Sequence, residues 1–443
     1  MTYNLKDIGI SIPEVLLPKE GVDFNKWAVV ACDQFTSEPE YWSSVEQYVG
    51  DSPSTLHMIF PEVYLEKGND TERINKINQT MIDYLDSNLL SSLGKGFIYI
   101  DRSTAHAKSR KGLILLIDLE CYDYNKGSQS LVRATEGTIV DRLPPRVKIR
   151  ENAPIELPHI MLLIDDPEKT VIEPLSEKTK SFQKLYDFDL MMDGGHIKGY
   201  KVSDEENLES VVKALNKLAC PDTFRVKYDL SKDSKVLLFA AGDGNHSLAT
   251  AKVYWEKIKN SISECQWENH PARYALVEVV NIHDDGLIFE PIHRVLFNAD
   301  VNKFLDDMSV YCNNKSGSKC RLTDCKTLNK ESNLHLIKYM SKDKEGFIEI
   351  ENPEFNLEVA TLQEFIDKYL KDNPHTTVDY IHGSDTLRKL SSLDNNLGFL
   401  LEPMKKNDLF KTVILDGALP RKTFSMGEAE EKRYYLECRK IVY

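Results

Sequence analysis

Short apolar runs alternate with amphipathic stretches along the whole chain. The runs predict strands at Trp27–Ala31, Phe97–Ile100, Leu113–Ile117, Ile160–Ile164, Lys235–Ala241, Tyr274–Ile282 and His335–Met340. Apolar positions three and four residues apart predict helices at Glu38–Tyr48, Glu72–Ser87, Glu205–Leu218, Ser247–Ile258, Leu362–Leu370 and Glu428–Arg439. Because strands and helices interleave without a strict repeat, we expect an α+β fold with mixed sheets rather than a regular parallel barrel.

The length of the chain predicts more than one domain. It has 443 residues, and an ordinary domain has about 150. Two polar, irregular segments, Asp165–Leu175 and Asn298–Asn333, are the expected domain edges. We therefore expect three regions, covering residues 1–165, 166–297 and 298–443.

Composition and charge exclude several classes of protein. Hydrophobic residues make up 41% of the chain and charged residues 28%, which excludes wholesale disorder. The formal net charge of −14 disfavours a nucleic-acid partner, because neutralising phosphates requires a basic surface. No apolar run is long enough to span a bilayer, and the first residues do not resemble a signal peptide. Eight cysteines without zinc-site spacing indicate free thiols, so we expect a cytosolic protein with no membrane partner.

One motif combines a glycine turn with the start of a helix. It reads Gly242-Asp243-Gly244-Asn245-His246-Ser247. The glycines let backbone approach a ligand, and a helix N-terminus offers free N–H groups to an anion. Asp243, Asn245 and His246 project into the same space, where Asp243 is a possible metal ligand. We expect Asn245 or Ser247 to cap the helix.

Other interpretations of this motif stay open. The spacing is a near miss of the dinucleotide-binding fingerprint, since the third glycine is absent. No phosphate-binding loop of the Walker type occurs in the chain. The turn is also compatible with a purely structural helix cap.

A basic stretch, Arg133–Arg150, contains five cationic side chains in an acidic protein. We expect a loop stiffened by Pro144 and Pro145 that binds phosphate, through Arg133, Thr138, Arg142 and Arg146. Glu136 would stay ionised among these cations and is the expected general base. A solvated charged loop is the alternative. The stretch has no aromatic residue, which again disfavours nucleic acid.

Further expected ligand contacts lie elsewhere in the chain. Asp33 and Gln34 follow a buried-looking strand and are expected to bind substrate. The neighbouring Cys32 reads as a core thiol rather than a nucleophile. His293 and Arg294 are expected to contact phosphate, although a histidine in an apolar run is also typical of a protein core.

Several motifs together resemble a large, mostly bacterial family of domains of unknown function. They are Trp27–Trp42, Arg142–Glu151, Glu156–Met161, Gly242–Ser247, Pro291–Arg294 and Pro420–Lys422. Much of that family has Asp-Gly-His-His-Arg where this chain has Asp-Gly-Asn-His-Ser. The Asp-Gly-x-His element is also similar to that of free serine kinases with a ParB/sulfiredoxin-like fold.

The resemblance to free serine kinases implies phosphoryl transfer to free L-serine. It implies a ParB/sulfiredoxin-like kinase core with additional α/β elaboration, and it gives Asp243 and His246 the roles of the turn at the phosphate. Glu136 takes the role of base, while Gly244, Asn245 and Ser247 join the phosphate contacts. Mg²⁺ would bridge donor oxygens near Asp243. Without a nucleotide-binding loop, we expect pyrophosphate as donor; ADP or ATP, phosphoserine hydrolysis, and a ParB-like ligand- or DNA-binding module are the alternatives.

Overall fold

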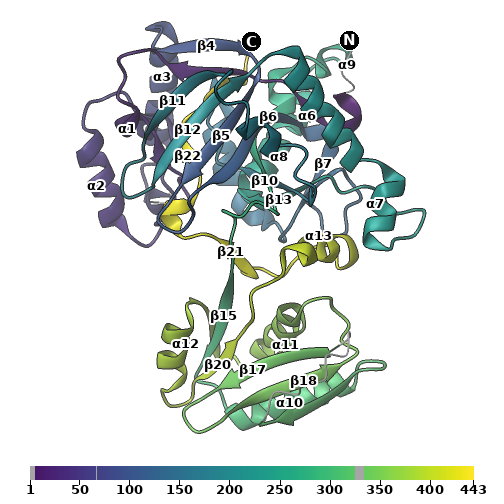
Figure 1. The fold of residues 1–443 in the computed structure, drawn as a ribbon. Helices are drawn as coiled ribbons and strands as arrows, with labels where there is room; N and C mark the ends of the chain where they lie inside the picture. The colour runs from purple at the N-terminus through teal and green to yellow at the C-terminus, as the bar shows by residue number, and fades with distance from the viewer. Residues whose placement is uncertain (1–4, 66, 325–333) are drawn as a thin grey trace. The chain divides into compact units, whose positions relative to one another are not determined.

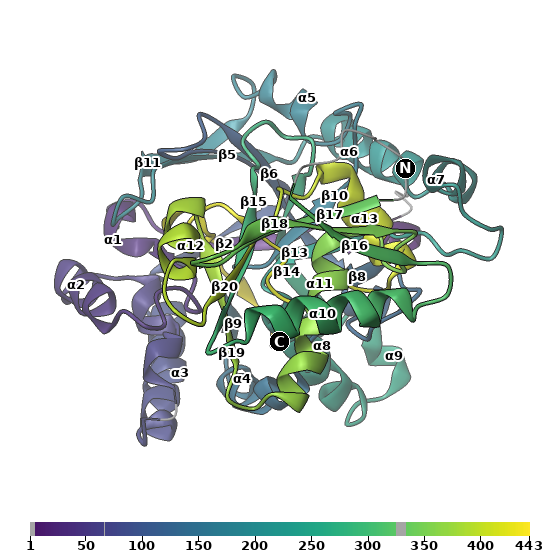
Figure 2. The ribbon, with the colours of Figure 1, turned by 90° about the horizontal axis from the view of Figure 1, so that it is seen from below.

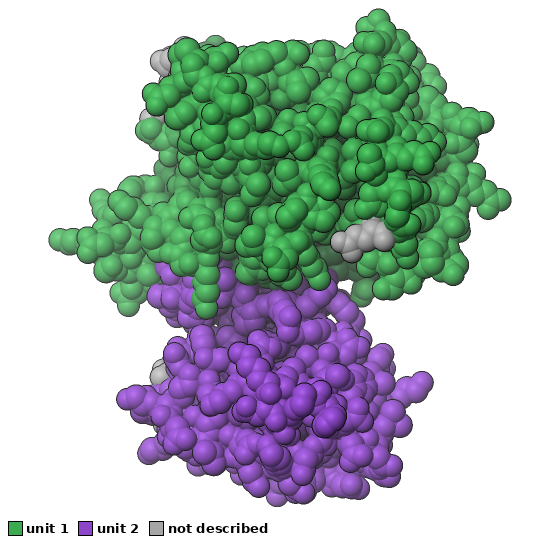
Figure 3. All heavy atoms as spheres, turned by 180° about the vertical axis from the view of Figure 1, so that it is seen from behind, with its two compact units in different colours: residues 1–288, 426–443 green, residues 289–425 purple. Residues whose placement is uncertain are grey.

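A computed structural model describes residues 5–65, 67–324 and 334–443. The chain forms two compact units (Figure 3). Unit 1 comprises Met1–Ile288 together with Met426–Tyr443, and unit 2 comprises Phe289–Ser425. The three expected regions are therefore replaced by two units, and the C-terminal residues return to the first of them.

The expected edge near residue 165 lies inside unit 1. Asp166 accepts hydrogen bonds from the backbone N–H groups of Thr170, at 2.5 Å, and Val171, at 2.9 Å. Asp165 is buried beside Lys227, whose Nζ lies 2.8 Å from its carboxylate. The polar residues here build a buried turn, so polarity did not mark a linker. The other expected edge contains a helix and a strand, and its last residues, 325–333, lie outside the described residues.

Unit 1 is built on a mixed ten-stranded sheet (Figure 1). Its order is β11 (Gln183–Asp189), β12 (His196–Val202), β5 (Phe97–Ser103), β6 (Arg110–Asp118), β14 (Tyr274–Asn281), β10 (Met161–Ile164), β13 (Phe239–Asp243), β8 (Val132–Ala134) and β7 (Tyr122–Asp123), with β1 (Ile10–Ser11) on β6. The pairs β10–β14, β13–β8 and β7–β8 are parallel, and the other pairs are antiparallel.

Both faces of this sheet are buried, which explains the continuous apolar runs of its central strands. Successive residues of a strand point to opposite faces. Leu113 and Leu115 of β6 pack in the core that contains Leu215 and Trp255. Ile114, between them in the sequence, packs in the second core instead.

The helices of unit 1 supply the apolar stripes that cover these faces. They are α1 (Phe24–Trp27), α2 (Pro39–Val49), α3 (Asp70–Asp86), α4 (Leu143–Glu151), α5 (Glu173–Ser176), α6 (Glu205–Leu218), α7 (Pro221–Tyr228), α8 (Asn245–Lys259) and α9 (Glu264–Trp267). Residues of α6 and α8 belong to the first core, and residues of α2 and α3 belong to the second. Every helix that the structure describes is too short or too polar to cross a bilayer.

The predicted helix Glu428–Arg439 is wrong. This segment contains the 3₁₀ turn η7 (Ala429–Glu431), followed by β22 (Tyr434–Tyr435) and β23 (Arg439–Lys440). β22 pairs with β3 (Val29–Val30), and β23 pairs with β9 (Ile155–Glu156). A third small sheet joins β2 (Glu14–Pro18) to β4 (Leu90–Lys95). Pairing with strands distant in sequence overrides the local helical spacing.

Unit 2 contains a seven-stranded sheet. Its strands are β16 (Lys319–Thr323), β18 (Glu345–Glu351), β17 (Leu334–Met340), β20 (Leu397–Leu400), β15 (Phe289–Phe297) and β19 (Thr377–His382), with β21 (Phe424–Met426) also on β15. Its helices are α10 (Val301–Asn313), α11 (Glu358–Asp372), α12 (Ser384–Ser391) and α13 (Lys406–Leu415).

Most predicted elements of both units are present. The expected α+β architecture with mixed sheets is confirmed, and five of the six predicted helices correspond to α2, α3, α6, α8 and α11. Two strands differ in extent: only Val29–Val30 is extended within Trp27–Ala31, and β13 begins at Phe239 rather than near Lys235. Trp27 instead ends α1, which Asp23 caps by accepting a hydrogen bond from the Asn25 backbone.

Candidate functional site

The turn between β13 and α8 presents an uncapped helix N-terminus. Gly244 is the N-cap residue, with φ of 73°, and no side chain caps α8. The expected cap by Asn245 or Ser247 is therefore wrong. A Cβ at residue 244 would lie 2.9 Å from the Cα of Ile160, so glycine meets both the left-handed conformation and the close approach. The first N–H groups of α8 are thus available to an anion.

Asp243 and Asn245 present oxygen atoms at this turn. One Asp243 oxygen accepts from the Gly244 backbone at 2.9 Å, and the other lies 3.5 Å from Lys432 Nζ. Asn245 Nδ2 donates to the Ala241 carbonyl at 3.2 Å, while its Oδ1 is buried without a hydrogen-bond partner. A buried polar atom without a partner is costly, so Asn245 Oδ1 marks a place that a ligand donor would satisfy.

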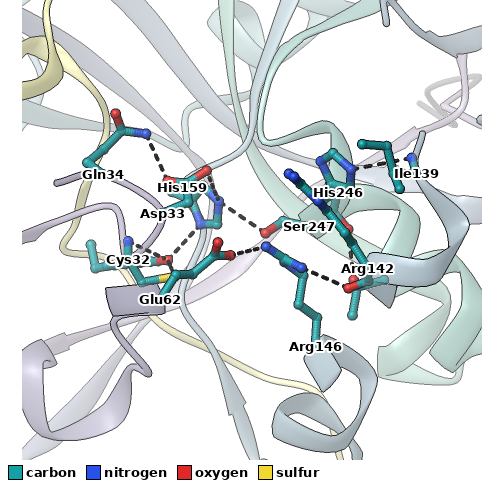
Figure 4. Close-up of polar contacts among 12 residues, drawn as sticks. Cys32, Asp33, Gln34, Glu62, Ile139, Arg142, Arg146, His159, His246 and Ser247 are labelled. Carbon is teal, nitrogen blue, oxygen red and sulfur yellow. Dashed lines mark hydrogen bonds and ion pairs between the residues drawn. The ribbon is translucent and has the colours of Figure 1, made fainter. Parts of the chain in front are cut away.

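Arg146 of α4 and Arg142, the N-cap residue of that helix, lie beside this helix N-terminus. Helix α4 packs on α8 (Figure 2), and its first turn contains Pro144 and Pro145, so the expected stiff loop is instead a helix. Arg146 pairs with Glu62 and donates to the Arg142 carbonyl at 2.7 Å (Figure 4). Burial and the positive charges of Arg146 and Arg142 lower the pKa of His246, which favours a neutral imidazole.

Two carboxylates face these cations from the N-terminal part of the chain. Asp33 accepts from Gln34 Nε2 at 2.9 Å, and its other oxygen lies 3.9 Å from His159 Nε2. Burial acts to raise the pKa of Asp33, but His159, Gln34 and Lys432 outweigh it and hold the pKa below its ordinary value. Burial raises the pKa of Glu62 and the charge of Asp33 adds to this, although Arg146 opposes the shift.

A hydrogen-bonded chain links His159 to both sides of the site (Figure 4). Its Nε2 lies 3.0 Å from Ser247 Oγ, and its Nδ1 lies 2.7 Å from the Tyr435 hydroxyl. That hydroxyl is also 3.0 Å from Cys32 Sγ. Burial raises the pKa of the Cys32 thiol, so it stays protonated and behaves as a core residue rather than a nucleophile.

The loop that carries Glu136 is attached to β13 at one end and to α8 at the other. Thr135 Oγ1 donates to the Ala241 carbonyl at 2.6 Å, and the Ile139 N–H points to His246 Nε2 at 3.4 Å (Figure 4). Glu136 is half-buried between these contacts. The hydroxyl of Thr138 is buried without a hydrogen-bond partner, as is Asn245 Oδ1.

We call this set of side chains the polar cluster. Its members are Asp33, Glu62, Arg142, Arg146, His159, Asp243, Asn245, His246, Ser247, Lys432 and Tyr435. The loop that carries Glu136 and Thr138 adjoins the cluster through the contact of Ile139 with His246. All of them belong to unit 1.

Three expected phosphate ligands have structural contacts instead. Arg133 Nε and Nη2 donate to the carbonyls of Ser130, at 2.8 Å, and Lys235, at 2.9 Å, so it ties β8 to the chain before β13. His293 and Arg294 lie on β15 of unit 2 and are 3% and 0% exposed. His293 Nδ1 accepts from the Leu401 backbone at 3.2 Å. These residues are committed to the interior, so the structure does not support their expected phosphate contacts.

Among the described residues, no group of three or more His, Cys, Asp or Glu side chains could hold a metal ion. Asp243 was the one expected metal ligand, and Lys432 Nζ lies 3.5 Å from its carboxylate. One carboxylate is not enough to hold Mg²⁺ by itself, because the ion commonly binds one or two carboxylates and takes its other ligands from phosphates and water.

Sequence reasoning missed Glu62, His159, Lys432 and Tyr435. Of these four residues, only His159 lies in a motif that the sequence analysis singled out, Glu156–Met161. Glu62 reaches the cluster because its backbone N–H donates to the Cys32 carbonyl at 2.8 Å. Lys432 and Tyr435 come from the segment that was expected to be helical.

The chain is similar in sequence to one family and in structure to several solved proteins. A family model described as "Protein of unknown function (DUF1015)" matches residues 16–378. Among curated proteins, no sequence matches this chain.

Solved structures with some similarity include "Free serine kinase in complex with AMP", at 9% identity and a TM-score of 0.38, covering 74% of this chain and 92% of that one. A conserved hypothetical protein from Pyrococcus furiosus has 10% identity and a TM-score of 0.34, covering 74% and 95%. SbnI from Staphylococcus aureus has 10% identity and a TM-score of 0.34, covering 71% and 83%. At this level of similarity the structures carry no inference about the activity of this chain.

If the polar cluster binds an anion, replacing Lys432 should weaken that binding. We expect Lys432→Met to raise the Kd for pyrophosphate by about tenfold to a hundredfold, because a hydrogen bond to a charged group contributes about 1.5–3 kcal/mol. Isothermal titration calorimetry measures the change. Lys440→Met, at an exposed lysine of β23, is the matched control and should bind like the wild type. Equal losses in the two variants would contradict an anion site at Lys432.

Proposed function

The chain belongs to the DUF1015 family, and from its site we propose that it transfers a phosphoryl group to the hydroxyl of free L-serine, forming O-phosphoserine. The observation that carries the proposal is the uncapped N-terminus of α8, with Arg142, Arg146 and Lys432 around it. Phosphoryl transfer needs little covalent help from a protein, and mainly requires alignment and charge neutralisation. N–H groups, arginines and a lysine supply both.

The transfer requires a group that accepts the serine proton. The serine hydroxyl oxygen forms a bond to the donor phosphorus as the bond from phosphorus to the leaving phosphate oxygen breaks. The hydroxyl proton passes to a carboxylate, which we propose is that of Glu136. Support comes from the Glu136 loop, whose flanking residues Thr135 and Ile139 are bonded to β13 and to α8.

Other residues in and beside the polar cluster would bind the two substrates. Arg142, Arg146 and the first N–H groups of α8 would hold the donor phosphates, and Thr138 and Asn245 would add their unpartnered oxygens. Neutral His246 would lie beside the transferred group. Asp33 and Gln34 would hold the amino group of serine, because the pKa of the Asp33 carboxyl is held low and it stays ionised. Magnesium would neutralise donor charge next to Asp243.

The donor is tested by direct assay. We propose pyrophosphate, because the chain has no recognisable nucleotide-binding loop. We expect magnesium-dependent formation of O-phosphoserine from L-serine and pyrophosphate, measured by chromatography, and loss of product when a chelator removes the metal. Reactions with ADP and ATP are run in parallel. Turnover with a nucleotide and none with pyrophosphate would show that the donor is a nucleotide.

The proposed base gives a sharper prediction. Glu136→Gln keeps the size of the side chain and removes the proton acceptor, so kcat should fall by about 10²–10⁴-fold while donor binding is retained. Steady-state kinetics and pyrophosphate titration on one preparation measure the two effects. Asp33→Asn and Glu62→Gln are examined alongside. A normal kcat for Glu136→Gln would move the base to one of the other carboxylates, with Asp33 and Asp243 first in line.

Asp243 decides whether the turn is a reaction centre or only a helix start. Asp243→Asn keeps a side-chain oxygen that can accept from the Gly244 backbone, so stability should change by no more than about 1 kcal/mol. Activity should nevertheless fall by orders of magnitude, because the charge beside Lys432 and the donor metal is lost. Thermal melting and kcat measure the two effects. Asp233→Asn, in an exposed loop, is the matched control. A folded Asp243→Asn variant with wild-type turnover would remove the turn from the mechanism.

A further inference from the structure

An apolar cavity of about 150 Å³ adjoins the polar cluster. Part of its wall belongs to the cluster: Glu62, Arg146, His159, Ser247 and Tyr435 line it. The rest is mainly aliphatic and aromatic, contributed by Met58, Phe60, Met81, Ile149, Ile155 and Leu276. The cavity therefore begins where the reacting groups are and continues into the apolar interior of unit 1.

Protein interiors are close-packed, and voids larger than a water molecule are few. An engineered apolar cavity of similar volume in another protein holds a six-membered hydrocarbon ring, so this cavity has room for a group of that size. Free L-serine has no group that would fill such a space. The cavity is thus larger and more apolar than the proposed acceptor requires.

We propose that this cavity is an acceptor subsite, and that the protein also phosphorylates β-hydroxy amino acids with an aromatic or branched aliphatic substituent. The inference rests on the proposed function, because it places the acceptor hydroxyl among the residues of the polar cluster. L-serine is then the smallest member of the acceptor class. The same bonds form and break as with serine, and the substituent enters the cavity.

The polar groups of the cavity wall favour a hydrocarbon group over the base of a nucleotide donor. Glu156 is already paired with Arg150 at 2.5 Å and Arg439 at 2.7 Å, and it accepts from the Leu276 backbone at 2.9 Å. Among the described residues of the cavity wall, only Arg150 has a buried polar side-chain atom, its Nε, without a hydrogen-bond partner. A nucleobase would bury several ring nitrogens and an amino group here without matching partners, which is costly.

Binding measured without a donor tests the subsite separately from catalysis. On the wild-type protein, calorimetry should show that threo-3-phenylserine binds at least about tenfold more tightly than L-serine, since an apolar group gains affinity in such a pocket. Ala153 lines the cavity and is 5% exposed, so Ala153→Leu would fill part of it. This variant should lose the preference for phenylserine. Ala214→Leu, the same change on α6 outside the cavity lining, should keep it.

Each other outcome has a defined meaning. Phenylserine that binds the wild type no more tightly than L-serine would overturn the proposal. If Ala153→Leu does not fold, a wild-type series of methanol, 1-butanol and benzyl alcohol decides: affinity that does not rise with apolar size also overturns it. Ala153→Leu that weakens AMP but not phenylserine would make the cavity a base pocket and overturn the proposal. If phenylserine shows the expected binding pattern but neither it nor serine is phosphorylated, the proposed function fails while the subsite stands.

Discussion

Unit 1 depends on a set of buried arginines that attach the C-terminal segment to the central sheet. Arg433 is 2% exposed, and it pairs with Glu278 of β14, at 3.2 Å, and with Glu437. Arg102 of β5 donates to the backbone carbonyls of Glu430, at 2.7 Å, and Lys432, at 2.6 Å. Removing one partner of a buried ion pair costs about 3–5 kcal/mol, because the other charge is left unpaired. These contacts therefore specify one position for the returning chain.

That position completes the polar cluster. Arg102 donates to the backbone carbonyls of Lys432 and of its neighbour Glu431, and Tyr435 belongs to β22, which pairs with β3. The chain must leave unit 1 to form unit 2 and then return before either side chain reaches the cluster. The site is thus assembled from both ends of unit 1, and its geometry depends on the same contacts as its stability.

Charges in the cluster are balanced in pairs. Arg146 pairs with Glu62, and Lys432 Nζ lies 3.5 Å from the Asp243 carboxylate. An anionic ligand would share these cations with their carboxylates, which is why single charge changes should alter ligand binding more than folding. Salt screens charges that are exposed to solvent, so a higher salt concentration would also weaken the binding of an anion at these pairs.

Local pattern determined the secondary structure of much of this protein. In β5, β6 and β14 the continuous apolar runs predict a buried strand, and in α6 and α11 the amphipathic spacing predicts a helix with one buried face. Each of these predictions needs only the residues of the segment itself. The turn Gly242–Ser247 was predictable for a similar reason, because glycines between an apolar strand and an amphipathic helix are typical of a tight backbone turn.

Only the tertiary structure decided which distant residues meet at that turn. Lys432 and Tyr435 lie in a segment with helical spacing, yet pairing with Val29–Val30 and the Arg102 contacts hold it extended. The sequence predicted Arg133 as a phosphate ligand, but its guanidinium donates to the backbone carbonyls of Ser130 and Lys235. The physical reason is range: periodicity reports whether a residue is buried, whereas the partner of a buried or charged group depends on chain topology that no local pattern contains.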